Sequence, residues 1–169
     1  MIKTAENVRT DKQNKNVPID NSSTAGIYGP LLDRGISEAT AKRYSVKLAV
    51  DSKGYPTQHF YPYFTANEVT AVKVRYVNDK HFTWKGYASD NGLFGEQIAP
   101  KKGKYITLTE GECDAMAAYE LLGSKWPVVS IKSGAAGATK DVKESLEFLE
   151  SFDNVVIAFD NDIRGREAA

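Results

Sequence analysis

The apolar positions of this 169-residue chain change their spacing along its length, and the changes divide it into three parts. Residues 1–24 are polar and show no apolar periodicity, which is typical of a disordered arm or an interdomain linker. Regular apolar positions begin at Ile27, and Ser37–Tyr44 predicts a short helix with Ser37 as its N-cap. We therefore expect a disordered arm over 1–24 and folded structure after it.

The second part, residues 25–100, carries the two-residue alternation of half-buried strands. Over 69–77, Val72, Val74 and Tyr76 share one face, whereas Lys73 and Arg75 share the other. Further strands are expected at 46–50, 59–64 and 81–84, and Pro62 favours an edge position for its strand. This part predicts a small antiparallel sheet with one or two short helices.

The third part, residues 101–169, alternates strands with helices. Apolar strands are expected at 105–109, 128–131 and 155–159. A helix is expected at 113–122, with Gly123 after its end and an inward face made of Cys113, Met116, Ala117 and Leu121. A second is expected at 141–152, with Asp141 and Glu144 as a capping box and with Val142, Leu146 and Leu149 inward. The overall fold class is α+β followed by α/β, and the second sheet should be parallel and buried on both faces.

Acidic residues follow two strands of the expected parallel sheet. Glu110, Glu112 and Asp114 come after the first strand, and Asp160 and Asp162 come after the third. Because the carboxyl ends of parallel strands share one edge, these carboxylates should meet there. Oxygen ligands of this kind suit Mg²⁺ or Mn²⁺. Gly111 allows a tight turn between strand and helix. The alternative interpretation is that the acids only cap helices.

Basic residues are concentrated in the first half of the chain. Residues 1–104 contain 16 basic and 10 acidic side chains, whereas residues 105–169 contain 6 basic and 12 acidic side chains. A basic half suits polyanion binding and an acidic half suits divalent cations, although two surfaces of opposite sign that attract each other would give the same count. Cys113 is the single cysteine, so we expect no zinc site. No apolar stretch approaches the ~20 residues of a membrane span, which favours a cytoplasmic protein with no membrane partner.

The strand over 69–77 and the residues after it combine basic and aromatic side chains. Lys73, Arg75, Lys80 and Lys85 are interleaved with the aromatic residues Tyr76, Phe82 and Trp84. Such a pattern suits phosphate contacts and base stacking. A solvated sheet face with the aromatic rings in the core is the alternative.

Three segments resemble the TOPRIM signature: ITLTEGECDAMAAYELL, VVSIKSGAAGATK and VVIAFDNDIRGREAA. Together with the upstream strings RGISEATAKRY, KVRYVNDKHFTWKG and DNGLFGE, they are most similar to the primase–helicases of podovirus-type bacteriophages and the related mitochondrial helicase. The resemblance covers about residues 30–169 and implies an antiparallel primase subdomain over 25–100. It also implies a TOPRIM subdomain over 101–169 that is truncated at its C-terminus.

The resemblance also implies roles for individual residues. Glu110 matches the glutamate assigned to metal binding or acid–base catalysis, and Asp160 and Asp162 match metal ligands. Glu112 and Asp114 match further acids near the metal, and Gly134 matches a loop glycine that keeps the site open. Basic residues of this region contact nucleotide phosphates and template in the family, which makes Lys73, Arg75 and Lys80 candidates, with Lys80 also a catalytic candidate. Thr83 stands where relatives carry a lysine, for which Lys85 is a possible substitute.

The function implied is that of a DNA primase core, a DNA-directed RNA polymerase that makes short RNA primers on single-stranded DNA during phage replication. It would use NTPs with Mg²⁺ or Mn²⁺ and would work beside a replicative helicase and a DNA polymerase. The sequence contains neither a cysteine-rich zinc module nor a phosphate-binding loop of the helicase type. Two alternatives stay open: a TOPRIM nuclease, and a non-catalytic module that binds single-stranded DNA.

Overall fold

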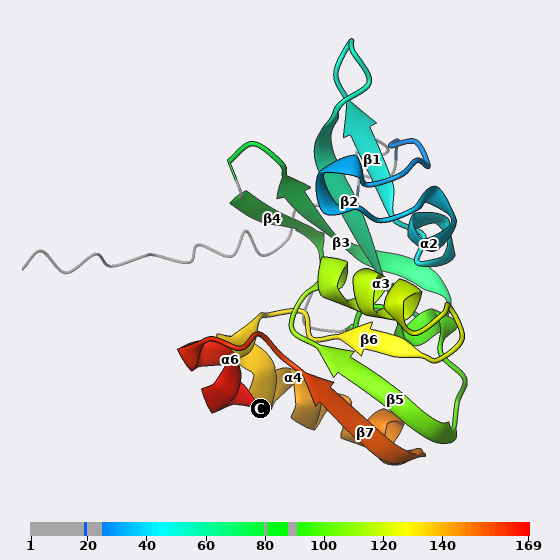
Figure 1. Ribbon diagram of the computed structural model, residues 1–169, viewed down its shortest axis with the longest axis vertical. Coiled ribbons are helices and arrows are strands. Elements are labelled where there is room, and N and C mark those ends of the chain that lie inside the picture. The colour runs from blue at the N-terminus through cyan, green and yellow to red at the C-terminus, as the bar shows by residue number, and fades with distance from the viewer. Residues whose placement is uncertain (1–18, 20–24, 80, 88–90) are drawn as a thin grey trace, which may run out of the picture.

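The computed structural model describes residues 19, 25–79, 81–87 and 91–169, and it contains two β-sheets with helices between and below them (Figure 1). One sheet has four strands and the other has three. The expectation for residues 1–24 lies outside the described residues except at Ile19, and Lys80 also lies outside them.

The first sheet is antiparallel and follows chain order, as the alternation predicts. Its strands, in the order β1-β2-β3-β4, are β1 (Lys47–Val50), β2 (Pro56–Thr65), β3 (Glu68–Tyr76) and β4 (His81–Gly86). β2 and β3 are joined by Ala66 and Asn67, which both have positive φ angles, of 50° and 70°. A tight two-residue connection of this kind requires left-handed backbone conformations, which explains why the hairpin is sharp.

The strand register places the polar and aromatic side chains of this sheet on one face. His59 lies opposite Arg75, and Tyr61 lies opposite Lys73, which in turn lies opposite Trp84. Directly opposite residues point to the same side of a sheet. This face is turned toward helix α3 of the second half of the chain (Figure 1). The other face carries a separate small cluster of Phe60, Val72 and Val74. The prediction that Lys73 and Arg75 share a face is confirmed.

The predicted edge position of the strand that contains Pro62 is wrong. β2 lies between β1 and β3, and Pro62 is opposite Val72 of β3. The physical reason is local, because β1 pairs only with residues 56–60 and ends before it reaches Pro62. A proline in this position therefore breaks no ladder hydrogen bond to β1.

Two short helical segments precede the sheet: η1 (Leu32–Arg34) and α2 (Glu38–Arg43). Ser37 is the N-cap of α2, and its hydroxyl accepts a hydrogen bond from the backbone N–H of Thr40 at 3.2 Å. The prediction of a helix capped by Ser37 is confirmed.

The second sheet is parallel, with strand order β6-β5-β7. Its strands are β5 (Gly103–Thr109), β6 (Val128–Ser130) and β7 (Phe152–Ala158). The helical segments around it are η3 (Glu96–Ile98), α3 (Glu112–Leu121), η4 (Ala135–Gly137), α4 (Ala138–Glu144), α5 (Leu146–Glu150) and α6 (Ile163–Ala168). α3 lies between the two sheets, and α4 lies on the opposite side of the parallel sheet (Figure 1).

Two apolar cores hold these layers together. The first joins the antiparallel sheet to α2 and α3 and includes Tyr61, Phe94 and Met116, each fully buried. The second fills the space between the parallel sheet and α4 and α5 and includes Ile106 and Leu149. Since α3 contributes to the core of the antiparallel sheet, the two halves pack against each other across it.

The helix predicted over 141–152 is in fact two helices, α4 and α5, and it begins three residues earlier. Asp141 does not form the expected capping box. Its carboxylate instead accepts hydrogen bonds from the backbone N–H groups of Lys132 and Ser133, at 2.9 and 2.8 Å. Leu149 is buried as predicted, whereas Leu146 is 46% exposed and the inward prediction for it is wrong.

The prediction that the parallel sheet is buried on both faces is also wrong for β7. This strand pairs only with β5, and Val155, Val156 and Ile157 are 39%, 45% and 49% exposed. Leu121, predicted to face inward, is 88% exposed at the end of α3. Gly123 follows α3 with a φ of 73°, as expected for a helix C′ glycine. Among the described residues, no helix combines the length and apolar character needed to cross a bilayer.

Candidate functional site

The acidic residues lie where the carboxyl ends of β5 and β7 meet, as the strand order requires. Gly111 is the N-cap of α3 and is followed at once by Glu112, which begins the helix. A Cβ on Gly111 would lie 2.6 Å from Oδ2 of Asp114. Glycine at this position therefore permits the carboxylate of Asp114 to approach the strand end, which supports the expectation for Gly111.

Glu110 has one carboxylate oxygen in a hydrogen bond and one without a partner. Oε1 accepts from the backbone N–H of Ala135 at 3.3 Å. Oε2 is buried and has no hydrogen-bond partner among the described residues. A buried carboxylate oxygen is costly unless a donor or a cation compensates it. This atom is therefore a candidate for contact with a cation.

Asp160 and Asp162 lie in the turn that leads from β7 into α6. Asp162 is the N-cap of α6, and its Oδ1 accepts from the N–H of Gly165 at 2.8 Å. A Cβ on Gly165 would lie 2.0 Å from the carbonyl oxygen of Asp160. The helix thus packs directly on the backbone of Asp160. The capping role suggested as the alternative is present for Asp162, and it occupies only one of its two oxygens.

The electrostatic state of Asp114 indicates how the carboxylates act on one another. Burial raises the pKa of Asp114, and the negative charges of Asp160, Glu112 and Glu110 raise it further. The cation of Arg34 partly opposes these effects. Within the described part of the chain, no three Asp, Glu, His or Cys side chains lie close enough together to form a ligand set for one ion. The negative charges of Asp160, Glu112 and Glu110 thus act on Asp114, but the described residues do not assemble a complete coordination shell.

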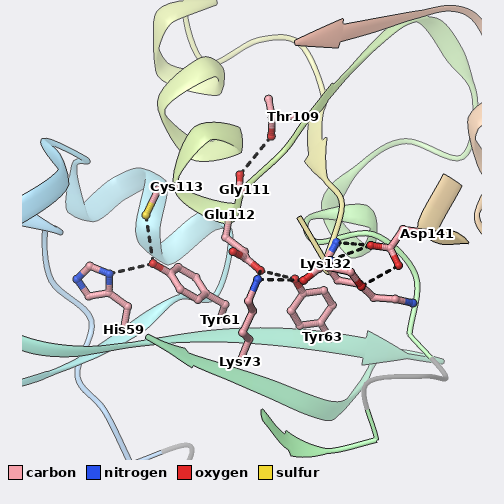
Figure 2. A network of polar contacts seen from close by, with 11 residues as sticks. His59, Tyr61, Tyr63, Lys73, Thr109, Gly111, Glu112, Cys113, Lys132 and Asp141 are labelled. Carbon is pink, nitrogen blue, oxygen red and sulfur yellow. Dashed lines mark hydrogen bonds and ion pairs between the residues drawn. The ribbon is translucent and has the colours of Figure 1, made fainter. Parts of the chain in front are cut away.

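Glu112 lies apart from this group because its carboxylate faces the antiparallel sheet. Its Oε1 accepts from the hydroxyl of Tyr63 at 2.6 Å and from the amine of Lys73 at 2.8 Å (Figure 2). The side chains of Lys73 and Glu112 are 13% and 5% exposed, so the ion pair is largely withdrawn from water. A pair of this kind ties β3 to the start of α3.

Lys73 also contacts groups beyond Glu112. Its amine donates to the carbonyl of Lys132 at 3.0 Å. It lies 5.0 Å from the ring centre of Phe82 and 5.7 Å from that of Trp84. Phe82 is 44% exposed, whereas Trp84 is partly buried against the core. The sheet-face alternative therefore holds for Trp84, and Phe82 remains accessible beside the lysine.

Arg75 points toward a different part of the molecule. Its guanidinium lies 3.5 Å from Oδ2 of Asp33, whose Oδ1 lies 2.9 Å from Nε2 of His59. Nδ1 of His59 lies 2.9 Å from the hydroxyl of Tyr61, and this hydroxyl lies 3.1 Å from Sγ of Cys113 (Figure 2). This series of polar contacts runs from the exposed Asp33 of η1 across the sheet, where His59 and Tyr61 are buried, to α3.

Four residues of this site were not predicted as site residues from the sequence: Tyr63, His59, Lys132 and Asp141. A lysine at the end of the apolar strand VVSI was a signal for a buried cation, although nothing in the sequence identified its partners. Lys85 lies on β4 opposite Val72, on the face away from α3. Gly134, the predicted loop glycine, has a φ of 66° and open space where a Cβ would be, so backbone conformation is what favours glycine there.

Comparisons with known proteins agree with this arrangement. The Toprim-like family matches residues 107–169, which include both acidic strand ends. The DNA helicase/primase of Enterobacteria phage T3 is 35% identical over 144 residues, 85% of this chain. Two solved structures superpose on this chain. The primase fragment of the bacteriophage T7 primase–helicase protein has a TM-score of 0.80 and 31% identity and covers 93% of this chain. A T7 complex has a TM-score of 0.78 and 32% identity and covers 91% of this chain. The chain belongs to the TOPRIM-containing primases of the bacteriophage primase–helicase family.

The T7 complex contains lagging-strand DNA polymerase with primase domains of two gp4 subunits bound to an RNA/DNA hybrid and dTTP. The present chain covers 77% of the matched chain of that complex, 64% of the T7 primase fragment and 25% of the T3 protein. The four-stranded and three-stranded sheets thus correspond to the primase part of much longer relatives.

Proposed function

We propose that this chain is the polymerising part of a phage primase, a nucleotidyltransferase that joins ribonucleotides on a single-stranded DNA template. The observation that carries the proposal is the meeting of the acidic strand ends of the parallel sheet with the basic face of the antiparallel sheet at α3. Synthesis requires both charges in one place, because a metal-binding group must act beside a group that holds a triphosphate.

Mg²⁺ or Mn²⁺ suits the acidic side of this site. Glu110 has a buried oxygen without a partner among the described residues, and burial raises the pKa of Asp114 while neighbouring negative charges raise it further. Both features indicate negative charge that a divalent cation would offset. We assign Glu110, Asp160 and Asp162 to holding the ion, with Asp114 beside them. The bound ion would supply positive charge against the charge that develops on the triphosphate.

Lys73 suits the phosphate side. An ammonium group donates three hydrogen bonds, and two of those of Lys73 go to Glu112 and the carbonyl of Lys132. Among the described residues this leaves one N–H for an incoming phosphate oxygen. Arg75 is paired with Asp33 instead. Lys80 and Lys85 remain candidates for template or nucleotide contact, and Lys80 also for catalysis, as the family resemblance implies.

In this reaction the 3′-oxygen bonds to the α-phosphorus of the next nucleotide and pyrophosphate leaves. The attacking 3′-hydroxyl must lose a proton, and Glu110 is our candidate for accepting it or for holding a second ion. Glu110→Gln keeps the size of the side chain and removes its charge. We expect template-directed dinucleotide formation to fall at least ~100-fold, with little change in binding of single-stranded DNA. Glu147→Gln on α5, an exposed acid, serves as the matched control and should keep wild-type activity.

The assay incubates the protein with NTPs, Mn²⁺ and a single-stranded template and separates new oligoribonucleotides from cut template. Template cleavage without RNA product would favour a nuclease. DNA binding that persists in EDTA, with neither product, would favour a non-catalytic binding module. Near wild-type dinucleotide synthesis by Glu110→Gln would show that Glu110 has no catalytic role.

A further inference from the structure

Lys132 is a buried cation at the point where β6 ends. The residue is 5% exposed. Its amine donates to the carbonyl of Asn91 at 2.5 Å and lies 3.0 Å from Oε2 of Glu144. An ammonium without partners is very costly at such a position, so these two contacts hold the side chain in one place. Asn91 precedes the parallel sheet and Glu144 belongs to α4, so the amine fastens two separate segments.

The backbone of Lys132 makes further hydrogen bonds to two other residues. Its N–H and that of Ser133 donate to Oδ2 of Asp141, which is 1% exposed (Figure 2). Its carbonyl accepts the hydrogen bond from Lys73. Three residues further on, the N–H of Ala135 donates to Glu110. The loop that begins at Lys132 therefore contacts the candidate phosphate-binding lysine and the candidate metal-binding glutamate at once.

We propose that Lys132 is a positioning residue for Lys73. Its amine, anchored on Asn91 and Glu144, fixes the carbonyl that holds the amine of Lys73 beside the acidic strand ends. Without that anchor Lys73 would keep Glu112 as its charged partner but lose a fixed second acceptor. A lysine side chain has several rotatable bonds, so one contact constrains it far less than two. The inference rests on the proposed function, in which Lys73 meets the triphosphate.

A position-sensitive probe lies within reach of Lys73. The ring centre of Trp84 is 5.7 Å from its amine, and a cation at this distance perturbs an indole. The chain has two tryptophans, and the other, Trp126, is 41% exposed and stacks edge-on with Tyr105. In a Trp126→Phe background, the emission of Trp84 therefore reports the position of Lys73 without any need for catalysis.

The test compares Lys132→Met with Lys140→Met in that background. Methionine keeps most of the length of the side chain, being one heavy atom shorter, and removes the charge. Lys140 pairs with the same acid, at 3.6 Å from Oε1 of Glu144, but it is exposed, and within the described part of the chain it is not bonded to Lys73 or to the carbonyl of Lys132. We expect Lys132→Met to shift the emission of Trp84 and to raise the KM for NTP about tenfold, the scale of one hydrogen bond to a charged group, with kcat within about twofold. Lys140→Met should change neither.

Unchanged emission and KM in Lys132→Met, or equal changes in Lys140→Met, would overturn the inference. A lower kcat together with a lower melting temperature, at an unchanged KM, would also overturn it, since this combination indicates a general loss of packing. If Lys132→Met does not fold, Glu144→Gln weakens the same anchor at a half-exposed position and is judged by the same two readouts. If the wild type neither binds NTP nor makes product, the proposed function fails, while the emission of Trp84 still decides whether Lys132 positions Lys73.

Discussion

The proton positions in the series of side-chain contacts from Asp33 to Cys113 follow from which groups can donate a hydrogen bond. Burial lowers the pKa of His59, which is therefore neutral in the fold, although Asp33 partly opposes this. The carboxyl group of Asp33 beside Nε2 of His59 favours the tautomer with the proton on that nitrogen, because the N–H dipole then faces the carboxyl oxygen. Nδ1 then accepts from the hydroxyl of Tyr61, and that oxygen accepts from the thiol of Cys113. Burial raises the pKa values of Tyr61 and Cys113, so both keep the protons that this order requires.

Stability should fall in mild acid because of His59. Since its folded pKa lies below its unfolded value, the unfolded chain binds more protons in the window between the two, and stability there rises with pH. As the pH falls below about 6.5, the ordinary pKa of a histidine, we expect the free energy of unfolding to decline by up to about 1.4 kcal/mol per pH unit. Urea titrations at several pH values measure the slope.

Substitution of each histidine in turn isolates this effect. His59→Gln should lose most of the slope below about pH 6.5, at some cost in absolute stability. His81, the second histidine, is exposed, and His81→Gln should keep the slope. If His59→Gln retains the wild-type slope, another group titrates in this window.

Local patterns predicted the strand alternation and the Ser37 cap correctly. They failed where a polar side chain has a partner in a distant segment. The alternation of Val72, Lys73 and Val74 gave the correct two faces of β3. Asp141 stood at capping-box spacing from Glu144, yet its carboxylate binds the loop after β6. No local signal distinguishes these two uses, because both satisfy backbone N–H groups and differ only in which segment supplies them.

The Ser37 cap also connects two helices. Oε1 of Glu120 on α3 accepts from the N–H and the hydroxyl of Ser37, at 2.9 and 2.5 Å. Ser37→Ala should cost about 1 kcal/mol in the free energy of unfolding, the usual loss for an N-cap. Glu120→Ala should cost less, because the cap itself remains, and the double substitution should cost less than the sum. Additive effects in urea unfolding would show that the two contacts are independent.

Burial differs sharply between two isoleucines of the parallel sheet, although both lie in apolar strands. Ile106 in the central strand β5 is fully buried, whereas Ile157 in the edge strand β7 is 49% exposed. Ile106→Thr should cost about 2 kcal/mol or more, because a hydroxyl enters the core and a cavity forms. Ile157→Thr should stay within about 0.5 kcal/mol. Similar losses from the two substitutions, measured by urea unfolding, would mean that β7 is covered in solution.

At the scale of the whole molecule, the two halves of opposite charge meet across α3. The sequence predicted both sheets, their strand directions and the acidic strand ends, because period and strand-end position are local properties. It did not predict that Glu112 turns away from the other acids to pair with Lys73 of the first sheet. That contact depends on how the two sheets are docked, which no spacing along the chain encodes.

The stability of a variant that lacks one carboxylate of the acidic strand ends, compared with the wild type, should depend on metal. Burial raises the pKa of Asp114 and the charge of Asp160 raises it further, so the two carboxylates repel each other when no cation is bound. In EDTA, Asp160→Asn should therefore be as stable as the wild type or more stable. With Mn²⁺ the order should reverse, since an ion that binds only the folded wild type at ten times its Kd adds about 1.4 kcal/mol. Asp153→Asn, an exposed acid at the start of β7, is the matched control and should respond to Mn²⁺ as the wild type does. Thermal melting of the three proteins in both buffers measures the effect, and an equal Mn²⁺ response in Asp160→Asn would place the ion elsewhere.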